Sequence, residues 1–441
     1  MAILQAPNRS PAAPPADGPR ERYTDYPLAL GVVTTIFFMW GFLTCLNDIL
    51  IPHLKALFEL NYKQAMLVQF TFFGAYFLMS LPAGRLVAHL GYKLGIVAGL
   101  AIAGVGAAGF WPAAGLHSYP AFLGALFVLA TGITVLQVAA NPYVALLGPE
   151  RTSSSRLTLA QALNSFGTFL APHFGGLLIL SVAVKSSLEV AQLSPAGQLA
   201  YRTQEAQTVQ GPYLGLAIAL FALALLVYLF RLPALEEATE QADRSHHTLM
   251  DALRIPHVLY GVIAIFCYVG AEVAIGSFMV NYLSLPQIGN MPETTAATYV
   301  SYYWLGAMIG RFAGSWLMTR YSPRALLALF AVINIALLAI TMSTGGTTAI
   351  WSVVAIGLFN SIMFPTIFTL GIERLGPLTE KASSLLIMAI VGGAIVPFAQ
   401  GALADAIGVQ AAFILPAVCY AYIVFYGLRG SRIVGAPLEA R

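Results

Sequence analysis

An acidic side chain lies inside a long apolar run near the start of the chain. Asp48 stands within residues 37–52, with Asn47 beside it and Thr44 about one helical turn earlier. An ionised group at the centre of a bilayer costs roughly 2.5–3.5 kcal/mol, so membrane proteins keep one mainly where it has a function. The pattern predicts that Asp48 is the ion-coupling or substrate-binding group of a membrane transporter.

A second acid, Glu272, lies in another apolar segment, four residues after Tyr268. It falls close to the counterpart of Asp48 when the two halves of the chain are compared. Two acids in corresponding helices are typical of proton or cation handling. The alternative is that Glu272 pairs locally with a hydroxyl or amide group and only stabilises packing.

Four amide side chains form two pairs in consecutive apolar segments. Gln137 and Asn141 are one helical turn apart, and Gln161 and Asn164 share one face of the next helix. An amide both donates and accepts hydrogen bonds, as the paired hydroxyls of a sugar require. The pattern favours sugar binding over the alternative, in which the amides only join helices.

Four other side chains extend this predicted binding site, the first of them Asn47, the amide beside Asp48. Asn360 is expected to line it from the second half of the chain, and Trp40 and Trp304 offer rings for the apolar face of a sugar. Large aromatic residues in membrane helices are more often packing or interfacial residues, and that alternative stays open for both tryptophans.

Two prolines and two charged loops predict moving parts. Each proline removes a helical hydrogen bond, which invites a kink. Each loop places a glutamate beside an arginine, and such pairs either break as two halves of a transporter rock or are solvated and contribute little. The predicted gating residues are Pro142, Phe364, Pro365, Glu150, Arg151, Glu373 and Arg374.

The composition identifies the elements that must position these groups. Of 441 residues, 58% are hydrophobic and 9% are charged, whereas soluble domains carry about 25% charged residues. Apolar segments of about 20 residues, the length that crosses a bilayer, predict twelve transmembrane helices. We therefore expect an all-α polytopic membrane protein whose helices form two pseudo-symmetric six-helix bundles.

The two halves repeat, and charge gives their orientation. A glycine, a glutamate and an arginine follow Pro142 by six, eight and nine residues, and the same three types follow Pro365 at the same spacings. Eighteen of the 22 lysines and arginines fall on one side, which predicts that both termini are cytoplasmic. The expected units are a disordered tail at 1–27, bundles at 28–230 and 256–430, a linker at 231–255, and a tail at 431–441.

Other classes of protein find little support in the sequence. It contains no phosphate-binding GxxxxGK[ST] loop and no HExxH or GxSxG motif, so ATP drive and hydrolytic chemistry are not indicated. The three cysteines are far apart and lack metal-ligand spacing. We expect no enzyme activity, no cofactor, no nucleic-acid partner, and a monomer in the lipid bilayer.

Three segments resemble the fucose permease (fucose:proton symporter) family of the major facilitator superfamily. They are residues 45–52 around Asp48, residues 137–142 with Gly148 and Glu150, and residues 159–167 around Asn164. The resemblance covers about residues 28–430. It implies the major facilitator fold, alternating access and uptake of a monosaccharide driven by a cation gradient. By position it also implies that Asp48 is the coupling acid and that Gln161 and Asn164 contact the sugar.

Two departures place the sequence nearer the glucose/galactose transporter branch. Fucose permeases carry a glutamate at the position of Gln137, and they do not obviously share Glu272. The coupling ion is therefore either a proton or sodium, the latter with a possible site at Asp48. The function expected is glucose/galactose-type symport across a bacterial inner membrane. Alternatives are uptake of fucose or N-acetylglucosamine, export of hydrophobic compounds, a sugar sensor, or a membrane-embedded enzyme acting on lipid-linked sugar.

Overall fold

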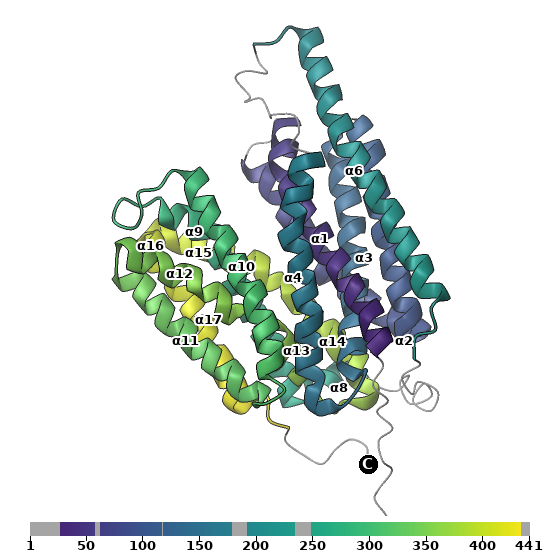
Figure 1. Ribbon diagram of the computed structural model, residues 1–441, viewed down its shortest axis with the longest axis vertical. Helices are drawn as coiled ribbons and strands as arrows, with labels where there is room; N and C mark the ends of the chain where they lie inside the picture. The colour runs from purple at the N-terminus through teal and green to yellow at the C-terminus, as the bar shows by residue number, and fades with distance from the viewer. Residues whose placement is uncertain (1–26, 58–61, 117, 179–191, 234–247, 434–441) are drawn as a thin grey trace, which may run out of the picture.

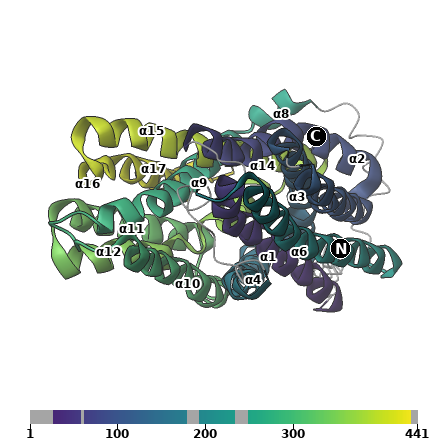
Figure 2. The ribbon, with the colours of Figure 1, turned by 90° about the horizontal axis from the view of Figure 1, so that it is seen from above.

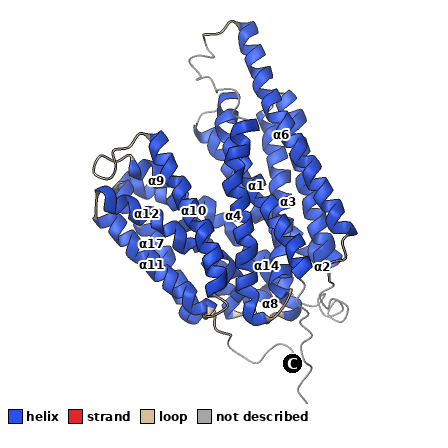
Figure 3. Cartoon of the chain, viewed as in Figure 1, coloured by secondary structure: helices blue, strands red, loops and turns tan. Residues whose placement is uncertain are grey.

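The structure, a computed structural model, describes residues 27–57, 62–116, 118–178, 192–233 and 248–433. Within these ranges, side chains are not described at 43–57, 62–66, 172–178, 199, 202, 205–209 and 293–294. The described residues are helical almost throughout and include no strand (Figure 3). The first tail, most of the linker and the end of the second tail predicted from the sequence lie outside the described residues.

Five long helices come from the first half of the chain and the remainder from the second. The first half contributes α1 Pro27–Leu57, α2 Tyr62–Gly115, α3 Tyr119–Leu146, α4 Ser153–Leu178 and α6 Pro195–Leu229. The second half contributes α8 Leu249–Leu253, α9 Pro256–Leu283, α10 Glu293–Leu317, α11 Pro323–Ser343, α12 Gly346–Asn360, α13 Met363–Gly371, α14 Thr379–Met388, α15 Gly392–Ile407, α16 Val409–Ala412 and α17 Ile414–Phe425.

The twelve predicted spans are all present, but several are joined or divided. The second and third predicted spans lie in one element, α2. The backbone turns between them at Gly91, whose φ of 75° is a conformation that glycine adopts easily. The predicted span at 349–371 is divided into α12 and α13 just before Pro365, where a proline interrupts the helical ladder. The predicted span at 382–404 comprises α14 and α15, and the predicted span at 410–428 comprises α16 and α17.

Eight of the described helical stretches are long and apolar enough to cross a membrane, and Pro27–Phe42 is a shorter apolar helix. Helices α4 and α10 are less apolar, because they carry serine, threonine and arginine side chains that meet between the two halves of the molecule.

The helices form two groups that stand side by side (Figures 1 and 2). The first half of the chain, purple to teal, makes one group, and the second half, green to yellow, makes the other. We call the end of the molecule at which α1 begins the terminal end; it is the lower end in Figure 1. The last described residues also lie there, as do α13 and α14, between the two groups.

Small residues bring α1 and α4 into backbone contact within the first group. A Cβ atom on Gly41 would lie 1.9 Å from the carbonyl oxygen of Asn164, and one on Gly167 would lie 2.2 Å from that of Phe38. Close packing of this kind is the usual way in which membrane helices associate without a hydrophobic driving force. It fixes α1, the helix that carries Asp48, against α4.

Candidate functional site

Helices α2 and α3 present a polar face that begins at Tyr76 and Gln137. The Gln137 Nε2 atom donates to the Tyr76 hydroxyl over 2.7 Å, and both side chains are buried. The first arm of α2, which ends at Gly91, and helix α3 both run toward the terminal end, so Ser80 and Asn141 lie one turn further along on the same faces. Asn141 is completely buried.

Several of these polar atoms have no hydrogen-bond partner within the described part of the chain. A buried polar group left in this way costs about 1–3 kcal/mol, and in native proteins it usually bonds to water or to a ligand. The atoms are Ser80 Oγ, Gln137 Oε1, Asn141 Oδ1 and Nδ2, Thr158 Oγ1 and Gln161 Nε2. We call these five residues, which come from α2, α3 and α4, the amide face.

Asn164 differs from the other predicted sugar-binding amides. Its Nδ2 atom donates to the carbonyl oxygen of Phe37 over 2.9 Å, and Thr168 one turn later donates to the carbonyl of Gly41 over 3.2 Å. Both bonds join α4 to α1. Asn164 therefore positions α1, and a direct contact with sugar stays a prediction for this residue.

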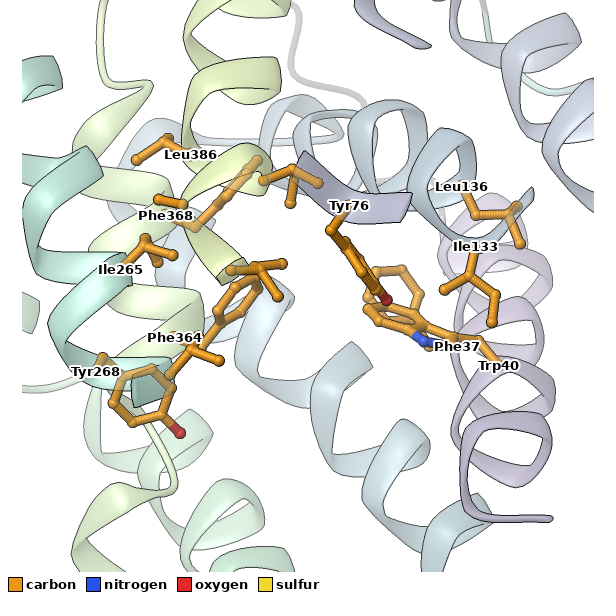
Figure 4. Close-up of a cluster of buried hydrophobic side chains, with 14 of the residues drawn as sticks. Phe37, Trp40, Tyr76, Ile133, Leu136, Ile265, Tyr268, Phe364, Phe368 and Leu386 are labelled. Atoms are coloured by element: carbon orange, nitrogen blue, oxygen red, sulfur yellow. The ribbon is translucent and has the colours of Figure 1, made fainter. Parts of the chain in front are cut away.

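Asp48 and Asn47 lie on α1 beyond this contact, but their side chains are outside the described residues. Their predicted roles in ion coupling and sugar binding therefore stay predictions. Trp40, on the same helix, is buried against Phe37 with the ring centroids 5.4 Å apart. Figure 4 shows these two rings and Tyr76 on one side of a cluster of buried hydrophobic side chains, with Tyr268 and Phe364 on the other.

Glu272 occupies the facing half and is partly buried. Its Oε1 atom accepts a hydrogen bond of 2.7 Å from the hydroxyl of Tyr268, one turn earlier on α9. The same hydroxyl lies 3.2 Å from the backbone oxygen of Asn360. Because a hydroxyl has one hydrogen, the shorter bond to the carboxylate is the stronger of the two.

Asn360 is the centre of a buried hydrogen-bond network. Its Nδ2 atom donates to the Tyr303 hydroxyl over 2.7 Å, and its Oδ1 atom accepts from Tyr420 over 2.6 Å and from Asn334 over 2.8 Å. These partners come from α10, α17 and α11, so one amide at the end of α12 joins four helices, and the backbone oxygen of Asn360 also lies beside Tyr268 on α9. Asn360 thus positions Tyr268 and Glu272, and a direct contact with sugar stays a prediction.

Trp304 lies on α10 beside this network. Its ring packs edge-on against Tyr303 at 5.2 Å, and the residue is 39% exposed. It is more accessible than Trp40, which is 9% exposed. Of the two predicted stacking residues, Trp304 therefore has more ring surface available for a ligand.

Arg311 on α10 is a central residue that the sequence analysis counted only among the flanking cations. Its Nη1 atom donates to Ser165 Oγ on α4 and lies 3.5 Å from the Gln161 carbonyl oxygen, while its Nε donates to the Ser361 carbonyl over 3.3 Å. Its charge also acts on the Glu272 carboxylate. The available sequence signal was its place inside the apolar run 302–318.

The predicted gating pairs lie at the terminal end. Glu150 and Arg374 join the two halves across 3.0 Å, with both side chains about half exposed. Glu373 pairs with Arg324 on α11. Burial raises the pKa of the Glu373 carboxyl, while the Arg324 charge acts in the opposite direction. Arg151 is exposed.

Uncharged contacts between the halves accompany these pairs. Ser154 Oγ lies 2.7 Å from Thr369 Oγ1, and Ser155 Oγ donates to the Ser315 carbonyl over 2.7 Å. Pro142 lies buried inside α3, and Phe364 and Pro365 lie buried in the first turn of α13. The described hydrogen bonds between the halves thus join α3, α4 and the loop before α4 to α10, α13, α14 and the loop after α13.

Comparisons with known proteins agree with this architecture. Residues 28–390 match the family model described as the Major Facilitator Superfamily. A glucose/galactose transporter of Brucella abortus is 53% identical over 408 residues, which span 92% of this chain and 95% of that protein. The L-fucose-proton symporter of Escherichia coli K12 is 39% identical over 407 residues, 91% of this chain and 92% of that protein.

A solved structure is also similar. The crystal structure of the Major Facilitator Superfamily transporter FucP in the outward conformation superposes with a TM-score of 0.88 at 38% identity, covering 93% of this chain and 100% of that chain. These matches extend over nearly all of both bundles. The chain therefore belongs to the Major Facilitator Superfamily, in the group that contains the glucose/galactose transporters and the L-fucose-proton symporters.

Proposed function

We propose that this protein is a secondary active transporter that imports a monosaccharide of the glucose/galactose type by symport with a cation, through alternating access. The observation that carries the proposal is the amide face. It offers both donors and acceptors that have no hydrogen-bond partner among the residues that the structure describes, and a sugar ring presents hydroxyls that both donate and accept. The name of the 53% identical relative supports glucose or galactose as the sugar.

The terminal end is the cytoplasmic side of a bacterial inner membrane in this proposal. The distribution of lysine and arginine supports that orientation. Contacts between the halves at this end, together with similarity to a transporter in its outward conformation, support an outward-open state for the described conformation. The sugar would then enter from the opposite side and reach the amide face.

Asp48 and Glu272 are the proposed coupling groups. Each is an acid in the first helix of its half, and the Tyr268 hydroxyl beside Glu272 stabilises the ionised form. The proton is favoured as the coupling ion because the 39% identical relative is named as a proton symporter. Sodium is the second candidate, since a carboxylate with amide and hydroxyl oxygens nearby also suits that ion.

Uptake into proteoliposomes tests the proposal. The purified protein is offered labelled glucose, galactose, fucose and N-acetylglucosamine under an imposed proton or sodium gradient. We expect accumulation of glucose or galactose with one of the two gradients. A protein that binds these sugars yet accumulates none of them under either gradient would be a sensor, and the proposal would fail.

The residue-level part of the proposal has its own variant. Asp48→Asn removes the ionisable group, so we expect gradient-driven accumulation to fall to the level of empty vesicles while exchange of sugar across the membrane persists. Asp405→Asn makes the same chemical change at an exposed position on α15 and should accumulate sugar like the wild type. Undiminished accumulation by Asp48→Asn would remove this residue from the coupling mechanism.

A further inference from the structure

Two prolines that correspond in the two halves each leave a backbone carbonyl without its helical partner. A proline has no N–H, so the carbonyl four residues earlier in the helix accepts no bond from it. Pro142 releases the carbonyl of Val138 in this way, and Pro365 releases that of Ser361. Within a bilayer such a group must find another donor.

The Val138 carbonyl is bonded from the other half of the molecule. Ser383 on α14, which is completely buried, donates its hydroxyl to this oxygen over 3.2 Å. Close packing holds α14 there, since a Cβ atom on Gly84 of α2 would lie 1.9 Å from the hydroxyl oxygen of Ser384. The acceptor made by Pro142 is thus part of the contact between α3 and α14.

The Ser361 carbonyl is bonded by Arg311 of its own half. The Nε atom donates to it over 3.3 Å, and the Nη1 atom of the same guanidinium donates to Ser165 on α4 in the other half. The planar guanidinium is rigid, so fixing its Nε directs its Nη atoms. The acceptor made by Pro365 therefore orients the arginine that reaches across.

Both contacts adjoin the amide face. Val138 directly follows Gln137, and the carbonyl oxygen of Gln161 lies 3.5 Å from the Arg311 Nη1 atom. A change in the tilt of α3 or α4 on binding a ligand therefore acts directly on these bonds. When the halves separate, water can enter and donate to a carbonyl oxygen that has lost its protein donor. Each carbonyl then exchanges one hydrogen-bond partner for another and is not left unpaired.

We propose that Pro142 and Pro365 provide two carbonyl acceptors that help fasten the halves together in this conformation, the first by accepting directly from Ser383 of the other half and the second by orienting Arg311, which reaches across to Ser165; Ser383 and Arg311 are the positioning residues. The inference rests on the proposed alternating-access function, because fastening matters only if the halves separate. It assigns to the two prolines a role other than making their helices flexible. It also gives the two repeat-related prolines one shared purpose.

Distance measurements between spin labels test this inference. Labels are attached at His89→Cys and Arg320→Cys, which are exposed positions in different halves near the terminal end, with the native cysteines replaced by alanine. Without sugar or ion gradient, we expect one dominant short distance. Ser383→Ala should raise the long-distance population relative to the short one by about two- to tenfold, as loss of one hydrogen bond predicts.

Ser384→Ala is the matched control, because the Ser384 hydroxyl donates within its own helix, to the Glu380 carbonyl, and alanine keeps the Cβ atom that packs near Gly84 of the other half. It should change the population ratio less than twofold. Pro142→Ala restores an N–H that competes for the Val138 carbonyl, so the effect of Ser383→Ala should fall to less than half in that background. Equal effects of Ser383→Ala and Ser384→Ala, or an undiminished effect of Ser383→Ala beside Pro142→Ala, would overturn the inference.

A second cycle tests the other acceptor and does not require Pro142→Ala to fold. Arg311→Lys keeps the charge but loses the forked donor, and Ser165→Ala removes its partner across the halves. We expect each single variant to raise the long-distance population. The double variant should raise it no further than either single variant, and fully additive effects of the two substitutions would overturn this part of the inference. The readout needs no substrate, so failure of sugar uptake with intact label responses would refute the proposed function alone.

Discussion

Some amide groups in this protein have no hydrogen-bond partner within the described residues, and others bond to the backbone of a neighbouring helix. The first kind is a candidate for binding sugar, and the second positions a helix. The Gln161 Nε2 atom has no partner within the described residues, whereas the Asn164 Nδ2 atom donates to the Phe37 carbonyl. The two residues share one helical face, so sequence spacing alone did not distinguish them. What distinguishes them is the backbone of α1, whose Phe37 carbonyl oxygen lies within hydrogen-bond distance of the Asn164 Nδ2 atom.

Alanine substitutions at these two positions should therefore have opposite profiles. Gln161→Ala removes a group without a protein partner, so we expect sugar affinity to fall by about two- to tenfold with an unchanged melting temperature. Asn164→Ala leaves the Phe37 carbonyl without its donor and should lower the melting temperature, at a cost of about 1–3 kcal/mol. Calorimetric titration and thermal unfolding in detergent measure both; the reverse profile would contradict this assignment.

At the scale of elements, the contact between α1 and α4 depends on glycine. Gly41→Ala would place a Cβ atom 1.9 Å from a backbone oxygen, which has little freedom to move, and the resulting overpacking should destabilise the protein by about 1–3 kcal/mol or more. Gly31→Ala, on the same helix with no atom within 4 Å of the added Cβ, should be neutral. Thermal unfolding compares them, and equal melting temperatures would show that the helices can move apart freely.

The sequence predicted the helical elements well because hydrophobic length is a local property. Twelve spans, the break near Pro365 and the repeat all followed from residue types and spacing. Arg311 did not follow, although it lies inside an apolar run, since two of its acceptors are backbone oxygens that carry no sequence signature. The network around Asn360 was equally hidden, because it exists only once four helices have packed.

For the whole molecule, the two ion pairs at the terminal end differ in burial and therefore in how strongly solvent screens them. The pair of Glu150 and Arg374 is half exposed, so it contributes at most about 1 kcal/mol and is screened by salt. Glu373 is more buried, and burial raises the pKa of its carboxyl. The sequence predicted these charges as gating residues from their loops, while the pairing of Glu373 with Arg324 rather than with its neighbour required the fold.

The raised pKa of Glu373 predicts a dependence of the conformation on pH. The closed terminal end binds a proton more readily than an open one in which the carboxyl is solvated, so acidification favours the closed state. This contribution is complete below the ordinary pKa of 4.5 and is lost as the pH rises through the raised value. The distance between labels at His89→Cys and Arg320→Cys, compared between pH 7.5 and 5, measures it.

Glu373→Gln isolates that dependence from other titrating acids. The variant should show a smaller change between the two pH values than the wild type, whereas Asp405→Asn should retain the full change. An identical response in Glu373→Gln and the wild type would assign the pH dependence to other groups.

The network centred on Asn360 has a consequence for how such a transporter can change its specificity. The Asn360 amide joins four helices of the second half, and its backbone oxygen lies beside Tyr268 on a fifth, so that half is a stiff unit in which a single substitution disturbs many contacts. The amide face of the first half has fewer such dependencies, because several of its side-chain atoms have no hydrogen-bond partner within the described residues. On the proposed function, new sugar preferences can therefore arise by substitution in α2, α3 and α4 while the network around Asn360 and Glu272 in the second half stays intact.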